Sequence, residues 1–577
     1  MERTNYNGTL TINDVNKDVV LVGWVHKKRN LGSLVFIDLR DRSGIVQVTV
    51  RENIKIPDIR NEYVIQVYGK VAKKDVANKA LKTGEIEVIA NKINVINTAI
   101  TPPMIIDDNT DALEDTRLKY RYLDLRRPIN QERLKIRAKI VKATHEYLDA
   151  NDFLEVETPI LTLSTPEGAR DYLVPSRLHH GCFYALPQSP QVYKQLLMIG
   201  GIERYYQIAK CFRDEDLRAD RQPDFTQIDI ETSFLDEEQL LTLMEGLIAK
   251  IFKDVINYEV KLPLRRIRYD IAVDTYGSDK PDTRFAMKLI DVKDILKDSS
   301  FNVFKTLNTI KAICVPGVAS KTSRKVIDKL QLEAKKFSLK GYTVLKVINN
   351  KLEGSFTKYL NDNISQKLIE KMVANNDDII IIAASDNYRD VCFGLGALRV
   401  SYANELKLIK PYTYDLLWVN DFPLFERSKE TNAITSSHHP FTRPKDEELK
   451  FLDTDPTRVH ASAYDIIING YEAGGGSLRI YNQDVQKKIF QILGLSDEDI
   501  KRKFGFFIDA FKYGTPPHAG IAFGLERLTM VLANTNNIRD VIAFPKNLAA
   551  VCPMSNSPRE VEQAQLDELG ISIKKEQ

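Results

Sequence analysis

The sequence predicts a multidomain α+β protein: a small N-terminal all-β barrel, an antiparallel sheet flanked by helices, and an α+β domain inserted into the second part. Three observations support this prediction. Short runs of alternating apolar residues fill positions 18–97, a strongly charged segment lies between two predicted strands at 211–231, and lysine-rich composition begins near residue 284. At 577 residues the chain is too long for a single hydrophobic core.

The N-terminal barrel is predicted from side chains that alternate between two faces. In the run 34–40 the odd positions form the core face, so Phe36 points outward. In the run 45–50 the even positions form the core face, so Gln47 points outward. The basic run from Lys27 to Arg29 precedes them. An exposed aromatic ring beside an amide and cations is suited to stack on and read an unpaired base. The alternative is that Phe36 only covers the mouth of the barrel.

A proline-containing linker and a long helix follow the barrel. The linker contains Pro102 and Pro103, and apolar residues then recur at helical spacing from Gln131 to the turn at Asn151. An extended segment ends at Pro159. We therefore expect the barrel at 1–105, a linker at 106–130, the larger domain at 131–283 and 409–577 with a C-terminal extension, and an inserted domain at 284–408.

The charged segment CFRDEDLRADRQPDFTQIDIE is predicted to be a hairpin loop, because the flanking residues 205–212 and 225–234 have the pattern of strands. Its arginines Arg213, Arg218 and Arg221 are suited to bind a polyanion, and phosphate is the natural candidate. The alternative is a solvated hairpin tip whose arginines pair with the carboxylates of the same loop.

Two glycine-containing segments lie near the C-terminus. In YEAGGGSLRI, residues 471–480, the glycines would let a ligand approach the backbone. Glu472 and Arg479 would lie on opposite faces of a regular strand, and a bulge at the glycines would bring both to one site. Arg527 lies in the first turn of a helix that follows Gly524, where backbone N–H groups favour an anion. A glycine-rich turn and a surface arginine are the alternatives.

Composition excludes several classes of protein. The five cysteines are odd in number and far apart, with no spacing suited to zinc or to a disulfide framework, which predicts a reduced, cytoplasmic compartment. The chain has no run of 18 apolar residues and no signal-peptide pattern, so it is expected neither to span a membrane nor to be secreted. A net charge of +3 is too small to predict nucleic-acid binding from bulk charge.

The order and text of these segments resemble class II aminoacyl-tRNA synthetases, specifically the bacterial-type aspartate branch. The helix and strand that end at Pro159 resemble motif 1, FRDEDLRADRQPDFTQID resembles motif 2, and GIAFGLERL resembles motif 3. TPEGARDYLVP, QSPQVYKQ, HHPFT and GYEAGGGSLRI also resemble the aspartate branch, and the resemblance runs essentially end to end. It implies an OB-fold that binds the anticodon, a class II catalytic domain and the extra domain of bacterial members.

The resemblance implies an ATP-dependent ligase that activates L-aspartate to aspartyl-adenylate and transfers the aspartyl group to the 3′-terminal adenosine of tRNA(Asp). Mg²⁺ would accompany the ATP. Both reacting groups are anionic, so catalysis should rest on positioning and charge stabilisation. The alternatives are a non-discriminating enzyme that also charges tRNA(Asn), a sister synthetase for asparagine or lysine, and an adenylating enzyme that does not use tRNA.

The resemblance also implies roles for individual residues. Arg213 and Arg527 are the expected catalytic residues, on the α-phosphate and the γ-phosphate respectively, and Phe225 would stack on adenine. The nucleotide would contact Arg213, Asp214, Glu215, Gln222, Phe225, Glu472, Gly524, Leu525, Glu526 and Arg527. Aspartate would contact Glu167, Gln191, Lys194, Arg213, Asp229, His438 and Arg479. Mg²⁺ would be held by Asp465 and Glu472, and the anticodon would contact Lys27, Arg29, Phe36 and Gln47.

Two further expectations concern tRNA choice and assembly. Leu31 resembles the members that charge only tRNA(Asp), whereas relaxed members tend to carry histidine there. A homodimer through motif 1 is implied, and the apolar helix face of Leu134, Ile140 and Tyr147 is suited to it. The alternative is that this face packs on its own domain.

Overall fold

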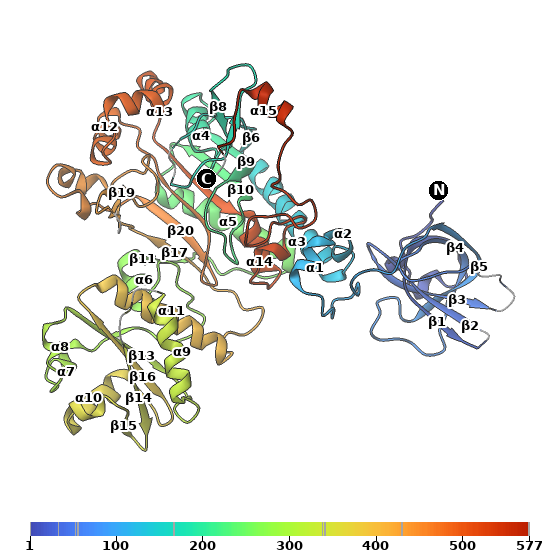
Figure 1. The fold of residues 1–577 in the computed structure, drawn as a ribbon, viewed down its shortest axis with the longest axis horizontal. Coiled ribbons are helices and arrows are strands. Elements are labelled where there is room, and N and C mark those ends of the chain that lie inside the picture. Colours follow the sequence, from blue (N-terminus) through green and yellow to red (C-terminus); the bar gives the residue numbers. More distant parts are fainter. Residues whose placement is uncertain are drawn as a thin grey trace. The chain divides into compact units, whose positions relative to one another are not determined.

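The computed structural model describes residues 2–574 except 33, 52, 53, 55, 56, 166, 167, 337, 338, 340, 341, 429 and 430 (Figure 1). The chain divides into two compact units. The first contains Met1–Ile136, Leu217–Ala219 and Arg539–Val561, and the second contains Arg137–Asp216, Asp220–Ile538 and Glu562–Gln577. This division groups the expected linker with the barrel and the inserted segment with the large sheet.

The first unit contains a closed barrel in the order β1-β2-β3-β5-β4, in which β3 and β5 pair in parallel. The predicted alternation is confirmed, because Ile37, Leu39 and Val46 are fully buried in the barrel core. Arg40 differs from the prediction: it is buried rather than exposed, because its Nη2 pairs with Oε2 of Glu62 at 2.7 Å. The strands are β1 Asp18–Leu31, β2 Leu34–Asp41, β3 Gly44–Arg51, β4 Val64–Lys73 and β5 Ile86–Asn97.

Three helices follow the barrel: α1 Glu114–Lys119, α2 Arg121–Asp124 and α3 Pro128–Asp149. The buried guanidinium of Arg121 donates to the carbonyl oxygens of Arg539, Ile542 and Ala543 at 2.8–3.1 Å. These hydrogen bonds attach residues near the C-terminus to the linker helices. They explain why a C-terminal segment belongs to the first unit.

The second unit is built on an eight-stranded sheet in the order β11-β17-β20-β21-β22-β10-β9-β6. Neighbouring strands are antiparallel except at the two edges, where β11 and β17, and β6 and β9, pair in parallel. The inserted segment therefore separates two parts of one sheet. The strands are β6 Leu154–Glu155, β9 Arg204–Phe212, β10 Asp224–Ser233, β11 Arg265–Arg268, β17 Leu416–Asn420, β20 Ala463–Ile468, β21 Tyr471–Leu478 and β22 His518–Gly524.

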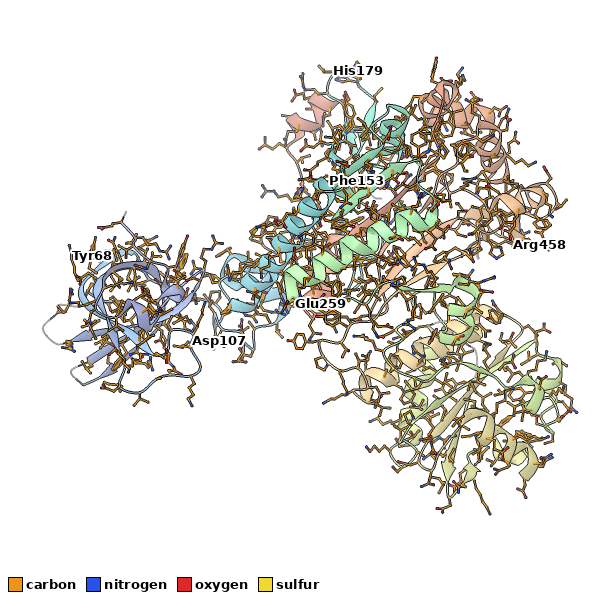
Figure 2. The ribbon with its side chains drawn as sticks, turned by 180° about the vertical axis from the view of Figure 1, so that it is seen from behind. Tyr68, Asp107, Phe153, His179, Glu259 and Arg458 are labelled. Carbon is orange, nitrogen blue, oxygen red and sulfur yellow. The ribbon has the colours of Figure 1, made fainter. Side chains whose placement is uncertain are left out.

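Helices cover this sheet, and α5 lies across one face of it (Figure 2). Asp236 caps the N-terminus of this helix and forms a capping box with Gln239, and Asn257 caps its C-terminus in the left-handed conformation. Its Leu240, Met244 and Leu247 are fully buried. The helices are α4 Gln191–Ile199, α5 Glu237–Ile256, α6 Tyr269–Tyr276, α12 Gln483–Ile492, α13 Asp497–Ala510, α14 Leu525–Leu532 and α15 Gln563–Leu569, and the small hairpins are β7 Leu173–Pro175 with β8 Phe183–Ala185 and β18 Phe425–Arg427 with β19 Ile434–Ser436.

The inserted segment forms its own antiparallel sheet in the order β12-β13-β16-β14-β15. The continuous apolar run of β16 is explained by burial on both faces, because Ile381 packs with Val391 of α11 and Ile382 packs with Leu368 of α10. The elements are β12 Ile290–Asp291, α7 Lys293–Leu296, α8 Val303–Thr306, β13 Thr309–Val315, α9 Arg324–Lys335, β14 Tyr342–Ile348, β15 Lys351–Glu353, α10 Asp362–Met372, β16 Ile379–Ser385 and α11 Tyr388–Glu405.

All five cysteines, at positions 182, 211, 314, 392 and 552, are free thiols. Within the described residues, no helix combines the length and the apolar character needed to cross a membrane.

Candidate active site

The charged loop leaves the large sheet at the end of β9 and returns at β10, as the sequence predicts. Arg213 directly follows β9, and its backbone N–H donates to the carbonyl oxygen of Pro223 at 2.8 Å. Its guanidinium lies 5.0 Å from the centre of the Phe225 ring. Arg221 pairs with Glu215 of the same loop at 2.8 Å. The loop therefore combines a cation held over an aromatic ring with an internal ion pair.

Strands β20 and β21 contain the bulge that the glycine segment predicts. Two adjacent residues of β20 face Glu472 and Gly474, so Ala473 is an extra residue between them. Glu472 and Arg479 consequently line the same pocket, although they are seven positions apart. The bulge lies immediately before the three consecutive glycines.

The glycines of β21 make room for neighbouring oxygen atoms. A Cβ atom on Gly475 would lie 2.4 Å from Oδ1 of Asp465 and 3.9 Å from Oε1 of Glu472. A Cβ on Gly476 would lie 2.0 Å from the carbonyl oxygen of Gly520 on β22. Any larger residue at these positions would displace a carboxylate of the pocket or separate two strands.

Two cations and two carboxylates form a fully buried cluster at the base of the pocket. Lys194 Nζ lies 2.7 Å from Oδ1 of Asp229 and 3.2 Å from Oε2 of Glu231. Arg479 donates from Nε to Oε1 of Glu231 at 2.8 Å and from Nη2 to Oε2 at 3.1 Å. Glu231 is not among the residues identified from the sequence. Its position two residues after Asp229 on β10 could have revealed it, because alternate residues of a strand share a face.

The pKa values of the two carboxylates in this cluster are shifted in opposite directions. Burial raises the pKa of Asp229, and the nearby ammonium of Lys194 only partly opposes that effect. Burial would also raise the pKa of Glu231, but the charges of Arg479 and Lys194 outweigh it and hold that pKa below its ordinary value. Glu231 is therefore the stable counter-ion of the cluster, whereas Asp229 retains an oxygen atom for another partner.

The ring of His439 packs against Phe441, which is fully buried among Phe490, Phe504 and Phe507. His438 packs against Phe422 instead. His439 Nε2 accepts a hydrogen bond from Nη1 of Arg479 at 2.7 Å. Burial, assisted by the charge of Arg479, holds the pKa of His439 well below its usual range. The ring is therefore neutral and orients Arg479.

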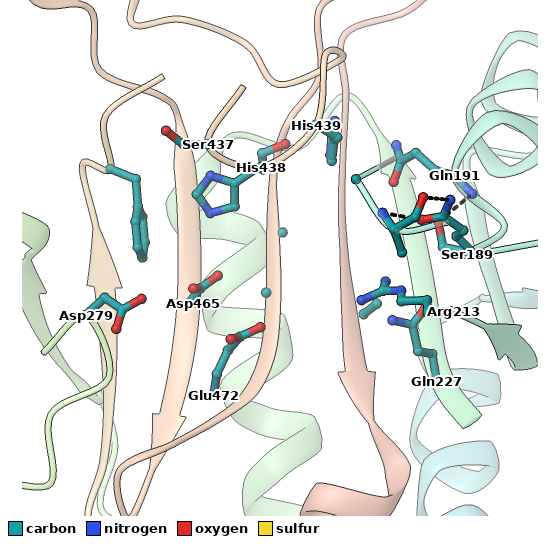
Figure 3. A pocket seen from close by; sticks show the side chains of 18 of the residues that line it. Ser189, Gln191, Arg213, Gln227, Asp279, Ser437, His438, His439, Asp465 and Glu472 are labelled. Carbon is teal, nitrogen blue, oxygen red and sulfur yellow. Dashed lines mark hydrogen bonds between the residues drawn. The ribbon is translucent and has the colours of Figure 1, made fainter. Parts of the chain in front are cut away.

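These side chains line a pocket of about 430 Å³ (Figure 3). Several of its buried polar atoms have no hydrogen-bond partner among the described residues, although native interiors rarely leave such atoms unpaired. Donors and acceptors both occur, so the pocket is suited to a polar ligand with charges of both signs. The atoms are Asp229 Oδ2, Gln191 Nε2, Arg213 Nε, His438 Nδ1 and Ser437 Oγ.

One part of the pocket is acidic, because Asp465 and Glu472 both face the space over Gly475 and Asp279 lies near them (Figure 3). Burial raises the pKa of Asp465 well above its ordinary value, and the charge of Glu472 adds to this effect. A bound cation would stabilise the ionised form of Asp465 and so oppose both of these effects on its pKa. The described residues hold no group of three or more His, Cys, Asp or Glu suited to a metal. Two carboxylates fit Mg²⁺, which usually takes its remaining ligands from phosphate and water.

Arg527 lies beside the acidic part of the pocket, in the first turn of α14. Its Nη1 donates to the carbonyl oxygen of Glu472 at 2.9 Å and lies 3.8 Å from Oε2 of the same residue. Its Nη2 lies 3.4 Å from Oδ2 of Asp220. The predicted helix start after Gly524 is confirmed.

Other residues that the resemblance implies for the nucleotide do not line the pocket. Oε2 of Glu526 accepts from the backbone N–H of Thr226 at 3.0 Å, and its Oε1 pairs with Arg137 at 3.2 Å, so Glu526 joins α14 to β10 and α3. Glu167, which the resemblance implies for aspartate rather than for the nucleotide, lies outside the described residues, and the nearby Gly168 lines the pocket. The residues that do not line the pocket are Asp214, Gln222, Phe225, Gly524, Leu525, Glu526 and Arg527.

The residues predicted to contact the anticodon lie on β1, β2 and β3. The guanidinium of Arg29 lies 6.0 Å from the centre of the half-buried Phe36 ring and pairs with Asp38 at 3.0 Å. Gln47 donates to Glu87 of β5 at 3.1 Å, a partner that the sequence did not indicate. The other two predicted residues of this part, Lys27 and Leu31, are exposed on β1.

Two of the three apolar residues of the α3 face, Ile140 and Tyr147, are buried or bonded within the protein, as the alternative interpretation expects. Ile140 is fully buried, and the hydroxyl of Tyr147 donates to the carbonyl oxygen of Leu243 on α5 at 2.8 Å. A Cβ on Gly246 would lie 2.1 Å from the same hydroxyl oxygen. The glycine lets α3 and α5 pack closely, and Tyr147 faces its own domain.

Comparisons with known proteins agree with the predicted fold class. Residues 113–548 match a family described as tRNA synthetases class II (D, K and N), and residues 19–96 match the OB-fold nucleic acid binding domain. An aspartate–tRNA(Asp/Asn) ligase of Bacillus subtilis is 51% identical over 586 residues, which covers 99% of each chain. An aspartate–tRNA ligase of Halalkalibacterium halodurans is 51% identical over 583 residues, covering 99% of this chain and 98% of the relative.

Solved structures share the fold at lower identity. An asparaginyl-tRNA synthetase from Pyrococcus horikoshii, in complex with asparaginyl-adenylate, aligns with a TM-score of 0.59 at 20% identity, covering 94% of this chain and 98% of that one. A putative aspartyl-tRNA synthetase from Leishmania major aligns with a TM-score of 0.59 at 18% identity, covering 95% and 94%. These similarities concern the fold alone.

Proposed function

The chain belongs to the class II tRNA synthetases of the aspartate, lysine and asparagine group, and on that basis we propose that it is an aspartate–tRNA ligase. In the first step an oxygen of the aspartate α-carboxylate attacks the α-phosphorus of ATP, and pyrophosphate leaves with the bridging oxygen. In the second step a hydroxyl of the 3′-terminal adenosine of tRNA attacks the aspartyl carbonyl carbon, and AMP leaves.

The unpartnered polar atoms of the pocket are the observation that carries this proposal. Asp229 Oδ2 is an acceptor suited to an ammonium group, and Arg213 Nε is a donor suited to a carboxylate or phosphate. Lys194 and Arg479 supply two cations deeper in the same pocket. An amino acid with an acidic side chain, joined to a phosphate, matches this arrangement.

The side-chain carboxylate of aspartate would bind between Lys194 and Arg479. Glu231 holds Arg479 with two hydrogen bonds, and His439 fixes a further nitrogen of the same guanidinium. The guanidinium of Arg479 is therefore preorganised, so its side chain loses little conformational freedom when the substrate binds. Gln191 and Asp229 lie where they could receive the ammonium group.

Arg213 would stabilise the charge that develops on the α-phosphate, while Phe225 offers an aromatic face for adenine. Arg527 would bind the far phosphate beside Glu472. Asp465 and Glu472 would hold Mg²⁺, which supplies Lewis-acid charge neutralisation to the phosphate oxygens when bound. Every proposed role is one of positioning or charge stabilisation.

We infer that the tRNA is held at its anticodon by the barrel face around Phe36 and Arg29. We also infer that tRNA(Asp) is preferred, because Leu31 resembles the discriminating members of the aspartate branch. The relatives named above include both ligases for tRNA(Asp/Asn) and ligases without that label. Charging assays on the two purified tRNAs test this inference, and equal aspartylation of both would contradict it.

Exchange of labelled pyrophosphate into ATP across a panel of amino acids tests the proposed activity. Aspartate should support exchange, and asparagine and lysine should not compete with it. A larger rate with asparagine or lysine would contradict the proposal. Activation without any transfer to tRNA would instead favour an adenylating enzyme.

We further propose a homodimer through motif 1, the segment made of α3 and the extended segment that ends at Pro159. Residues 154–184, which begin with the motif 1 strand, expose several large apolar side chains, and a second subunit could cover them. Sedimentation at micromolar concentration should give twice the mass of one chain, and a monomer would contradict the dimer. The exposed residues are Leu154, Ile160, Leu161, Leu163, Leu173, Leu178, Phe183 and Tyr184. The free thiols are consistent with a cytoplasmic location.

A further inference from the structure

The inserted domain reaches the pocket through Arg389, near the start of α11. Arg389 also borders a second cavity of about 440 Å³, together with Tyr269 and Glu426. The three side chains therefore form part of the wall between two cavities. Sequence patterns gave no indication of this role, because a single arginine in a helix resembles any surface cation.

Local contacts hold the backbone of Arg389 in place. The side chain of Asn387 caps α11 and accepts from the backbone N–H of Arg389 at 3.1 Å. The neighbouring Tyr388 donates to Oδ1 of Asp274 at 2.7 Å, and the buried ammonium of Lys311 lies 2.6 Å from the same oxygen. Asp274 lies on α6, so these contacts attach the start of α11 to an adjoining helix.

The joint between α6 and α11 is tightly packed. A Cβ on Gly396 would lie 2.2 Å from the carbonyl oxygen of Gly277, which ends α6. Arg399 of α11 is buried and donates to the carbonyl oxygens of Phe285 at 2.9 Å and Met287 at 3.1 Å. The inserted domain is thus anchored where the chain enters it, and Arg389 is carried on a rigid support.

The guanidinium of Arg389 retains hydrogen-bonding capacity. In the described part of the chain only its Nη2 has hydrogen-bond partners, the hydroxyl of Tyr269 and Oε1 of Glu426, both at 3.3 Å, and the group lies 5.6 Å from the centre of the Phe393 ring. Burial lowers the pKa of Arg389, but Tyr269, Glu426 and Asp279 outweigh it, so the group remains charged. A planar guanidinium with donors to spare suits a bidentate oxyanion.

We propose that Arg389 binds a phosphate group of a substrate, which makes the inserted domain part of the active site. This inference rests on the proposed function. Asp279, whose charge acts on Arg389, lies at the opposite side of the pocket from Arg213, with Asp465 and Glu472 between them (Figure 3). The phosphate comes either from the pyrophosphate end of ATP or from the phosphodiester next to the 3′-terminal adenosine of the RNA.

The full-length variants Arg389→Ala and Arg389→Lys test the proposal in two assays. ATP–pyrophosphate exchange without RNA reports on the nucleotide, and single-turnover transfer from preformed aspartyl-adenylate reports on the RNA. Arg389→Ala should slow one of these assays by roughly 10- to 100-fold, the expected effect of losing a charge-assisted contact, and Arg389→Lys should recover part of the loss. Slower exchange identifies the nucleotide phosphate, and slower transfer alone identifies the RNA phosphate.

Two controls separate binding from structure. Arg427→Ala removes a neighbouring arginine that lies outside the main pocket and should change neither assay. Glu426→Gln removes the ion pair and should cost much less than Arg389→Ala. The proposal is overturned if Arg389→Ala leaves both assays within about twofold of wild type, or if Glu426→Gln reproduces its loss. Wild-type protein without aspartate-dependent exchange would instead contradict the proposed function.

Discussion

Arg479 and Glu231 are joined by two buried hydrogen bonds, 2.8 Å from Nε to Oε1 and 3.1 Å from Nη2 to Oε2. The two residues are 248 positions apart in the chain. Their pairing turns one guanidinium into a fixed part of the pocket floor. Under the proposed function, that guanidinium would bind the side-chain carboxylate of the amino acid.

Arg479→Leu should abolish aspartate activation while leaving ATP binding largely intact. The substitution removes charge-assisted hydrogen bonds of about 1.5–3 kcal/mol each, so the loss of two would reduce kcat/KM for aspartate by roughly 10²- to 10⁴-fold. ATP–pyrophosphate exchange measures activation, and equilibrium dialysis measures ATP binding. Arg479→Lys, which keeps the charge, should retain more activity. A parallel loss of ATP binding would contradict the assignment.

Asparagine should be a poor substrate without any editing step. Its amide cannot satisfy both Lys194 and Arg479, so one or two charge-assisted hydrogen bonds are lost. The loss of two such bonds, about 3–6 kcal/mol, corresponds to roughly 10²- to 10⁴-fold discrimination in kcat/KM. Exchange rates with the two amino acids measure this ratio. A ratio below about tenfold would mean that the carboxylate binds elsewhere.

Gly475→Ala should raise the Mg²⁺ concentration needed for exchange. The new Cβ would lie 2.4 Å from Oδ1 of Asp465, so the carboxylate must move from its position. Gly505→Ala is a matched control on α13, where the Cβ would meet only Lys501 Cγ at 3.7 Å. The control should keep its Mg²⁺ dependence and gain up to about 1 kcal/mol in stability. Identical Mg²⁺ titrations for the two variants would show that Asp465 does not hold the ion.

His439 should make the protein less stable as the pH falls. Its pKa in the folded state is well below the usual value of 6.5, mainly because of burial, so below that pH the unfolded chain binds a proton that the folded protein does not. Stability is therefore lost as pH falls from about 7 to 5.5, by at most about 1.4 kcal/mol per pH unit for one group. His439→Gln should reduce this loss in thermal melts across that range. The control His179→Gln, at an exposed histidine, should leave the loss of stability at low pH unchanged.

Phe36→Ala should raise the KM for tRNA and leave amino acid activation unchanged. A lost base stack is worth about 1–3 kcal/mol, which corresponds to roughly 5- to 150-fold in affinity. Tyr68→Ala is the matched control, because Tyr68 is an aromatic residue of β4 that contacts Lys92. Aminoacylation at varied tRNA concentration measures the KM. Equal effects of the two variants would indicate a general loss of barrel structure.

Local sequence patterns were sufficient to predict the strands that position the residues of the pocket. Alternation predicted β9 and β10, and the conflict between Glu472 and Arg479 on a regular strand predicted the bulge. Spacing could not show that Tyr147 bonds to α5, because an apolar helix face looks the same whether its partner is internal or another chain.

The sequence by itself determined the family, the barrel, the strands and most of the charged residues near the pocket, because each of these depends on neighbouring residues or on short motifs. Only the tertiary structure decided which of those charges meet. Glu231 reaches Arg479, and Arg389 enters the pocket wall from the inserted domain, through contacts between distant segments. Burial then sets their protonation, since the cost of a charge depends on the solvent and partners that the fold leaves around it.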